Sequence, residues 1–478
     1  MPTDRDSRAT PTRVAFLVYN DVYSDTRVLK IAATVAAAGA EVRIFAFSSR
    51  YGRFGPGIEQ RDGFAIERVP LTELRHVLPA LGRAVRRMRP GRRPVTTVAT
   101  PASATPAGTA PASTDAARTT PASTTPASKA PASTAPRPPQ GLKARVIDLW
   151  GRFDLTVRAA SFRRRAARAV RDWKPDLVHA HDANTLRTAM AAAGRSIPLV
   201  YDSHELWRHR NVRQDRPIGR VAERITERRG ARRAGLVVTV SPSIATWLRR
   251  EYRLPETPIL VRNIPPAQPL PDAASGRLRE LAGLTPADTV LAYCGGITTN
   301  RGIEQSIEAL AHLDASVHLV MLGFGSDRYL ADLRALAAAR GVADRVHEVG
   351  AVASDEVSAA LADADLSLVL IRPQVLSYEY SLPNKLFESI HAGLAVLGND
   401  LPDTAAIIRE WGVGTVVPVE ATPAQLADRI REALAGSSEF RANSRAAAAE
   451  LTWEGEAARL LSGYRRLLGS GTSLDAHP

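Results

Sequence analysis

A lysine and a glutamate three residues apart, Lys385 and Glu388, lie in a stretch that suits the binding of a phosphate group. Pro383 has no backbone N–H and favours extended geometry before it, so we expect Asn384 to be the N-cap of a helix over residues 385–391. The unpaired N–H groups and the dipole at a helix start attract anions, and Lys385 adds a full positive charge there. The spacing places both side chains on one helical face, although an ordinary surface ion pair has the same spacing.

The composition supports the chemical interpretation. Of 63 basic residues only five are lysines, and the other 58 are arginines. In so arginine-rich a chain, a lysine at a helix start indicates a chemical requirement.

Polar side chains also follow three apolar runs in the first half of the chain, which begin at residues 13, 176 and 197. These polar residues are Asn20, Asp21 and Asp25 in the first loop, and His179, His181, Asp182, Asp202, His204 and Glu205 in the other two. Two histidines that alternate on a strand point to one face, so a metal site is not excluded. Because no HExxH or cysteine pattern is present, we expect polar contacts with a substrate and no metal.

Glycine turns follow two apolar runs of the second half. Gly295 and Gly296 precede a helix with Arg301 at its start, and Gly323 and Gly325 follow the next run. Glycines at a strand-to-helix turn allow the backbone to approach a ligand closely.

The elements that must position these residues alternate between short apolar strands and amphipathic helices. This alternation predicts an α/β protein with two doubly wound, Rossmann-like domains that face a cleft. We expect the first domain at residues 11–264 and the second at 286–452, because residues 265–285 are polar and rich in proline. A final helix at residues 453–470 is expected to pack back on the first domain.

Length and charge bound the class of protein. A chain of 478 residues favours two domains, and no apolar run approaches the ~20 residues that span a bilayer. A single cysteine, Cys294, and a start without an apolar leader agree with the cytoplasm. The net charge of +14 allows phosphorylated substrates or an anionic membrane. Nucleic acid is not expected as a partner, because the basic residues form no recognisable binding module.

Two segments stand apart from this pattern. Residues 90–140 repeat Pro-Ala-Ser and lack large apolar side chains, which predicts a disordered surface insertion in the first domain; a regulatory tail is the alternative. Residues 143–173 form a predicted helix that is dense in arginine. It would contact the inner face of an anionic membrane, or it is a domain helix with a solvated polar face.

Several motifs together resemble the retaining glycosyltransferases of family 4, which have the GT-B fold. They are DTRVLKIAATVAAAGAEV, HAHD, YDSHEL, YCGGITTNRGIEQ, LGFG and SLPNKLFESIHAGLAVLGND, and their order covers nearly the whole chain except the Pro-Ala-Ser segment. The resemblance implies a transferase that uses a nucleotide sugar, held by the second domain, and an acceptor bound by the first. It implies no cofactor and no metal.

The resemblance also implies roles for single residues. Arg301 and Lys385 match the cations on the donor diphosphate, Glu388 matches the glutamate on the ribose, and His204 matches the histidine near the reacting sugar carbon. We expect the donor also to contact Gly295, Gly296, Gly323, Gly325, Glu379 and Asn384. The acceptor side would comprise Asn20, Asp21, Asp25, His181, Asp182, Asp202 and Glu205.

Two positions depart from the family pattern. Gly296 replaces the usual first basic residue, and Tyr380 replaces the first glutamate of the usual pair, with Glu379 beside it. The implied function is metal-independent, retaining transfer of a hexose to a saccharide, lipid-linked or small-molecule acceptor, in cell-envelope polysaccharide biosynthesis. The alternatives are a nucleotide-sugar 2-epimerase of the same fold and a non-catalytic binding protein with a decayed site.

Overall fold

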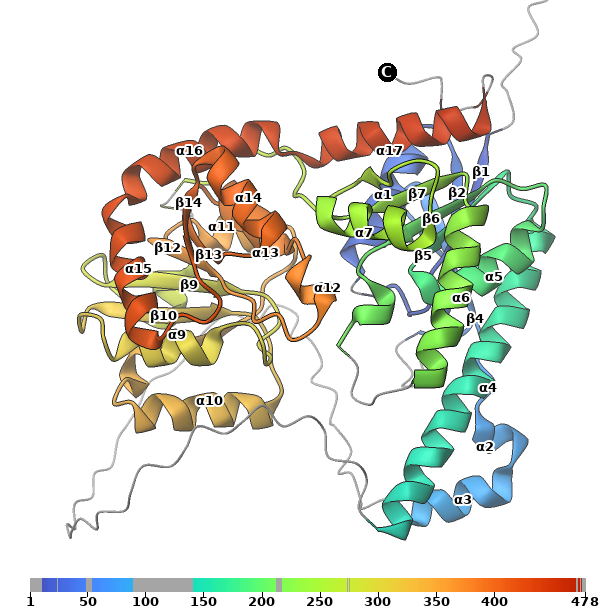
Figure 1. Ribbon diagram of the computed structural model, residues 1–478, viewed down its shortest axis with the longest axis horizontal. Coiled ribbons are helices and arrows are strands. Elements are labelled where there is room, and N and C mark those ends of the chain that lie inside the picture. Colours follow the sequence, from blue (N-terminus) through green and yellow to red (C-terminus); the bar gives the residue numbers. More distant parts are fainter. Residues whose placement is uncertain are drawn as a thin grey trace, which may run out of the picture. The chain divides into compact units, whose positions relative to one another are not determined.

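The computed structural model describes residues 11–23, 25–48, 54–88, 141–211, 217–272, 274, 276–469, 472 and 474. Most of these residues form two sheets with helices on their faces (Figure 1). The expectation of two doubly wound α/β domains is confirmed. The predicted insertion at residues 90–140 lies outside the described residues.

The first sheet has the strand order β3-β4-β2-β1-β5-β6-β7-β8. Its strands are β1 (Arg13–Leu17), β2 (Glu41–Phe47), β3 (Gly57–Arg61), β4 (Phe64–Val69), β5 (Leu177–His181), β6 (Leu199–Ser203), β7 (Leu236–Thr239) and β8 (Ile259–Leu260). All neighbouring strands are parallel except β3 and β4, and β3 was not predicted, because its exposed residues lack an apolar run. The strand order reverses between β1 and β5, where doubly wound sheets bind their ligands.

Helices join these strands and cover the sheet. They are α1 (Thr26–Ala37), α4 (Leu142–Trp173), α5 (Ala183–Ala193), α6 (Pro217–Arg233) and α7 (Pro242–Tyr252), with a 3₁₀ turn at Trp207–His209. Asp25 caps α1 by accepting from the Val28 backbone N–H, and Ser241 caps α7 in the same way through Ile244. These caps fix where each loop at the carboxyl edge of the sheet ends.

The second sheet has the order β11-β10-β9-β12-β13-β14, and all its strands are parallel. Its strands are β9 (Thr289–Cys294), β10 (Val317–Leu322), β11 (Val346–Gly350), β12 (Leu366–Val369), β13 (Ala395–Asn399) and β14 (Gly414–Val417). Its helices are α8 (Leu278–Ala282), α9 (Ile303–Leu310), α10 (Asp327–Ala339), α11 (Val357–Leu361), α12 (Leu376–Glu379), α13 (Asn384–His391), α14 (Pro402–Trp411), α15 (Pro423–Ala435) and α16 (Ser437–Glu450), with a 3₁₀ turn at Ala343–Arg345. Here the order reverses between β9 and β12, so the loops after these two strands meet.

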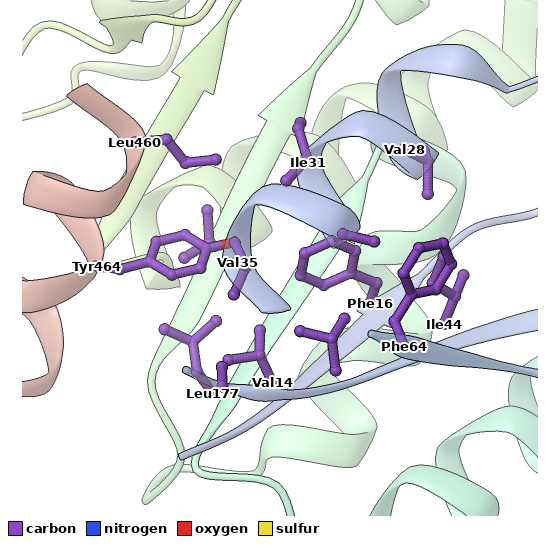
Figure 2. Packing of buried hydrophobic residues seen from close by; sticks show 14 of the residues in the cluster. Val14, Phe16, Val28, Ile31, Val35, Ile44, Phe64, Leu177, Leu460 and Tyr464 are labelled. Carbon is purple, nitrogen blue, oxygen red and sulfur yellow. The ribbon is translucent and has the colours of Figure 1, made fainter. Parts of the chain in front are cut away.

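The helix α17 (Trp453–Leu468) follows the second domain but packs against α1, β7 and β8 of the first sheet. Figure 2 shows Leu460 and Tyr464 directed into the same core as Val14 and Ile31. The indole N–H of Trp453 donates to the Thr34 hydroxyl at 2.8 Å. The core of the first sheet therefore includes a segment from the far end of the chain.

Residues 72–159 form a compact unit of their own, whose described part is a helical hairpin. It contains α2 (Leu74–Val77), α3 (Pro79–Met88) and the first half of α4. The sequence of residues 71–88 predicts a single helix, and this prediction is wrong, because Pro79 does not continue α2 and instead begins α3. Among the described helices, none has an apolar run of the length that crosses a membrane.

Candidate active site

The start of α13 carries an unpaired, buried cation. The helix begins at Asn384, one residue earlier than predicted, and its N-cap Pro383 offers no side-chain cap. The Lys385 ammonium is buried, lies 3.8 Å from the Tyr293 ring centroid and has no hydrogen-bond partner among the described residues. Burial lowers the pKa of Lys385 to about 8. A buried cation without a partner, beside open helix N–H groups, is suited to an anion.

Lys385 lines a cavity of about 380 Å³ at the reversal point of the second sheet. We name this cavity the donor cavity, after the contacts predicted for its residues. Those of its residues that carry polar groups or are glycine are His204, Glu205, Tyr293, Cys294, Gly295, Gly296, Thr298, Arg301, Ser377, Tyr378, Ser381, Asn384, Lys385 and Glu388. The Arg301 guanidinium lies 5.2 Å from the centroid of the Tyr378 ring. The cavity thus holds the two predicted cations together with the predicted glutamate.

Glu388 connects the donor cavity to a second hollow. Burial raises the pKa of its carboxyl group, and the Cys294 thiol donates to it at 3.5 Å. Glu388 and Asn384 also line a cavity of about 310 Å³ that contains Lys30, Asp355 and other residues. The two cavities therefore adjoin at Asn384 and Glu388.

Three residues that were predicted to contact the sugar donor lie outside the donor cavity, namely Gly323, Gly325 and Glu379. A Cβ atom on Gly323 would lie 1.9 Å from the Gly295 carbonyl oxygen, and one on Gly325 would lie 2.8 Å from the Ile297 carbonyl. These two glycines therefore allow the loop after β9 to pack closely on the loop after β10. Glu379 lines a separate surface groove.

The loop after β1 lines an adjoining cavity of about 370 Å³. Its residues are Asn20, Asp21, Tyr23, Asp25, Thr26, Arg27, His204, Val240, Asn263, Leu382 and Asn384. The Asn20 amide donates to Asp25 at 2.7 Å and accepts from the Val22 backbone N–H, which holds the loop in shape. This cavity brings together the three polar residues predicted in the first loop, and we name it the acceptor cavity after the role predicted for them.

His204 lines both the donor and the acceptor cavity. Its Nε2 lies 3.1 Å from an Asp202 oxygen, and its Nδ1 lies 3.4 Å from an Asp182 oxygen. These two carboxylates raise the pKa of His204 to about 9 against the opposing effect of burial. The ring is held between two negative groups and carries a proton at neutral pH.

Asp182 adopts a costly conformation to make this contact. Its φ of +61° and ψ of 160° are unusual for a residue with a side chain, and it precedes α5 without capping it. Its carboxylate instead accepts the backbone N–H of His204 at 3.2 Å. The strained conformation of Asp182 thus places its carboxylate against the backbone and the ring of His204. Glu205, the next residue, lines the donor cavity, and burial raises the pKa of its carboxyl group.

Two predicted acceptor residues, His181 and Asp202, are wholly buried behind His204. Both oxygens of Asp202 accept from Arg27, at 2.7 and 2.9 Å, and His181 Nδ1 lies 3.2 Å from His204 Nε2. Because these side chains end in the interior, they do not line either cavity, and we correct their assignment from acceptor contact to support of His204. His179 stacks on His181 with ring centroids 4.2 Å apart and bonds to Tyr464 of α17.

The same cluster could offer ligands to a metal ion. Ligand atoms of His179, His181 and Asp202 lie within 4.8 Å of one another. However, the Arg27 guanidinium already neutralises Asp202 and occupies both of its oxygens. A second cation at this place would be repelled, so the donor set does not fit a metal well.

We expect Asp202→Asn to lower the free energy of unfolding by about 3–5 kcal/mol, because it leaves the buried Arg27 guanidinium without a partner. The ion pair holds the pKa of Asp202 well below its usual value, although burial opposes this. Its stabilisation is therefore present above the unfolded pKa of about 4 and is lost as the pH falls below it. Urea unfolding of both proteins at pH 7 and at pH 3 measures this.

The matched control for that experiment is the exposed pair Arg429–Glu432. Arg429→Met should cost less than about 1 kcal/mol. Equal losses in the two variants would contradict a supporting role for the buried pair.

Sequence reasoning missed Arg27, although a signal for it was present. In α1 the buried residues Val28, Ile31 and Val35 recur at helical spacing, and Arg27 lies four residues before Ile31 on this face. A charge on the buried face of a helix requires a buried partner. The strain at Asp182, in contrast, has no counterpart in the sequence pattern.

Comparison with known proteins agrees with this architecture. A family model for Glycosyltransferase Family 4 matches residues 120–263, and a model for Glycosyl transferases group 1 matches residues 288–436. Together the two models cover more than half of the chain.

Two curated relatives are each 32% identical to this chain over part of its length. The D-inositol 3-phosphate glycosyltransferase of Xylanimonas cellulosilytica matches over 188 residues, which are 36% of this chain and 44% of that protein. The lipopolysaccharide glucosyltransferase WaaG of Escherichia coli matches over 161 residues, which are 33% of this chain and 41% of that protein. The matched segments thus span less than half the length of these relatives.

Solved structures share the fold at low sequence identity. Sucrose-phosphate synthase from Thermosynechococcus elongatus has a TM-score of 0.64 at 15% identity, and the match covers 96% of this chain and 100% of the other. WaaG has a TM-score of 0.55 at 19% identity, covering 93% and 98%. Anabaena HepE in complex with UDP-glucose has a TM-score of 0.57 at 13% identity, covering 94% and 99%.

The fold and the two meeting cavities define a two-domain α/β protein with the GT-B architecture. With a family 4 model on its first domain and a group 1 model on its second, the chain contains a Glycosyltransferase Family 4 domain followed by a Glycosyl transferases group 1 domain.

Proposed function

We propose that the protein transfers a sugar from a nucleotide-sugar donor to a saccharide, lipid-linked or small-molecule acceptor. The observation that carries this proposal is that His204 lines two adjoining cavities of different character. One contains two cations beside a helix start, and the other contains the side chains of Asn20, Asp21 and Asp25. A donor and an acceptor bound in these cavities would meet at His204.

In this proposal, the protein binds the nucleotide sugar through its charged diphosphate and its polar ribose. The diphosphate would lie against Arg301, Lys385 and the N–H groups of α13, and the ribose would lie at Glu388, beside the passage to the next cavity. The similar protein HepE has been solved in complex with UDP and with UDP-glucose, which supports a uridine nucleotide as the first donor to test.

We propose that the sugar keeps its anomeric configuration. The bond between the anomeric carbon and the diphosphate oxygen breaks, and the acceptor oxygen bonds to the same face of that carbon. The acceptor proton passes to the leaving phosphate oxygen. Arg301 and Lys385 stabilise the charge that grows on the diphosphate, which makes a divalent metal unnecessary.

The acceptor cavity favours this function over a nucleotide-sugar 2-epimerase, which converts the donor alone. The epimerase needs no second binding site, whereas the loop after β1 is held in shape by Asn20 and Asp25 around one. We further propose that the protein works in the synthesis of cell-envelope polysaccharide, because its relative WaaG is a lipopolysaccharide glucosyltransferase. We propose the cytoplasm as the place of this reaction.

Calorimetric titration tests the proposal. UDP, GDP, ADP and dTDP, and then their sugar conjugates, are titrated with and without EDTA. We expect one nucleotide to bind selectively, with the same affinity in EDTA. Donor turnover is then followed with and without acceptor sugars, and the configuration of the product is read by NMR. Turnover without any acceptor would favour the epimerase, and failure of every nucleotide to bind would contradict the proposed function.

A further inference from the structure

The described part of residues 72–159 forms a helical hairpin (Figure 1). Large apolar side chains are exposed on both α3 and α4. On α4, Leu142 is 80% exposed and Phe153 is 56% exposed. Leu142, Leu149 and Phe153 are seven and four residues apart, so they lie on one face of that helix. Soluble proteins rarely leave such a row of apolar side chains in water without a partner.

The helix α3 also has an exposed apolar face, and its opposite face is basic. Leu81, which is 51% exposed, and Met88 are seven residues apart and share a face. Arg83, Arg86 and Arg87 fall on the opposite face. Arginine opposite an apolar face is the pattern of helices that lie in a membrane interface.

The hairpin is held together by contacts of its own. The Leu74 backbone N–H donates to Asp154 at 2.8 Å, and a Cβ on Gly82 would lie 3.5 Å from the Trp150 ring. The exposed apolar residues are therefore presented on a folded element.

The charge of the hairpin selects its partner. Its described residues, 72–88 and 141–159, contain eight Lys or Arg and three Asp or Glu. Such a surplus attracts an anionic lipid surface and opposes the pairing of two identical hairpins.

The second half of α4 has a different role. Most arginines of the predicted membrane helix at residues 143–173 lie in this half, but its residues Phe162, Ala166, Val170 and Trp173 are buried in the core of the first domain. The exposed apolar residues that can contact lipid therefore lie in the first half of α4.

We propose that α3 and residues 142–159 of α4 form a docking surface for an anionic membrane. The apolar row enters the boundary between headgroups and acyl chains, and the arginines and Lys143 bind the lipid phosphates. The proposal does not depend on the donor or the reaction.

Vesicle flotation of the full chain tests it. Vesicles of phosphatidylglycerol and phosphatidylcholine are compared with vesicles of phosphatidylcholine alone, at low and high salt. We expect binding to the anionic vesicles only, weaker at high salt. The triple variant Arg83→Glu, Arg86→Glu, Arg87→Glu should reduce partitioning at least about tenfold.

A second triple variant, Leu142→Ser, Leu149→Ser, Phe153→Ser, should reduce it similarly. The matched control is Leu281→Ser, which changes an exposed leucine of α8. Since all the changed residues are exposed, circular dichroism and thermal unfolding should match the wild type.

Three outcomes would overturn the proposal. They are a wild-type protein that does not float with anionic vesicles, equal floating of wild type and both triple variants, and equal loss in Leu281→Ser. A wild-type dimer that the apolar variants convert to monomer, without vesicle binding, would assign this surface to a second copy of the chain.

Discussion

Replacing Lys385 with methionine should lower kcat/KM for sugar transfer by roughly 10²–10³-fold while the protein remains folded. The change keeps the volume and removes the charge that would stabilise the leaving diphosphate. Because the Lys385 ammonium is buried without a hydrogen-bond partner in the described residues, it is itself a cost to the fold. Loss of activity without loss of stability would therefore mark a functional cation.

The pH dependence separates this effect from simple damage. The pKa of Lys385 is lowered to about 8, so its cost to stability is fully present below pH 8 and disappears as the pH rises towards 10.5. Lys385→Met should hence be as stable as wild type, or more stable, at pH 7. In wild type, kcat/KM should fall as the pH rises through about 8, and the variant should lack this decline. Wild-type turnover in Lys385→Met would rule out the role.

His204 should titrate near pH 9, and His204→Gln should lower kcat/KM by roughly 10²-fold. The elevated pKa follows from Asp182 and Asp202 on either side of the ring. NMR of the imidazole nitrogens measures this pKa directly. A His204 that loses its proton below pH 7 would contradict the geometry.

Asp182→Asn tests whether the charge of Asp182 raises the pKa of His204. Asparagine tolerates the positive φ of this position and still accepts the His204 N–H, but it has no charge. We expect the pKa of His204 to fall by about one unit with little change in stability. A purely structural Asp182 would leave this pKa unchanged.

Much of the architecture could be predicted from local pattern. Buried parallel strands are continuous apolar runs, such as residues 13–17 and 289–294, and the turns between them contain glycine or proline. The cations Arg301 and Lys385 were found because both stand at helix starts that follow such strands. In doubly wound sheets this position is enough to bring distant residues into one cavity.

The sequence did not predict which polar residues at strand ends are buried and which line a cavity. Asn20, His181 and Asp202 have the same polar character and all follow or end strands, but only Asn20 reaches a cavity. His181 and Asp202 are the last inward-facing residues of paired strands, opposite each other in register. Sequence shows that a polar residue is near a strand end, and only the packing of Arg27 from α1 decides whether it is inside.

The position of α17 has a consequence for synthesis on the ribosome. The first domain is translated about two hundred residues before Leu460 and Tyr464 emerge, yet these side chains fill its core. Until then, the apolar surface of α1 and the Nδ1 of His179 have no cover from this helix. Domains usually fold in order as they emerge, but the core of this one is complete only after the whole second domain has been synthesised.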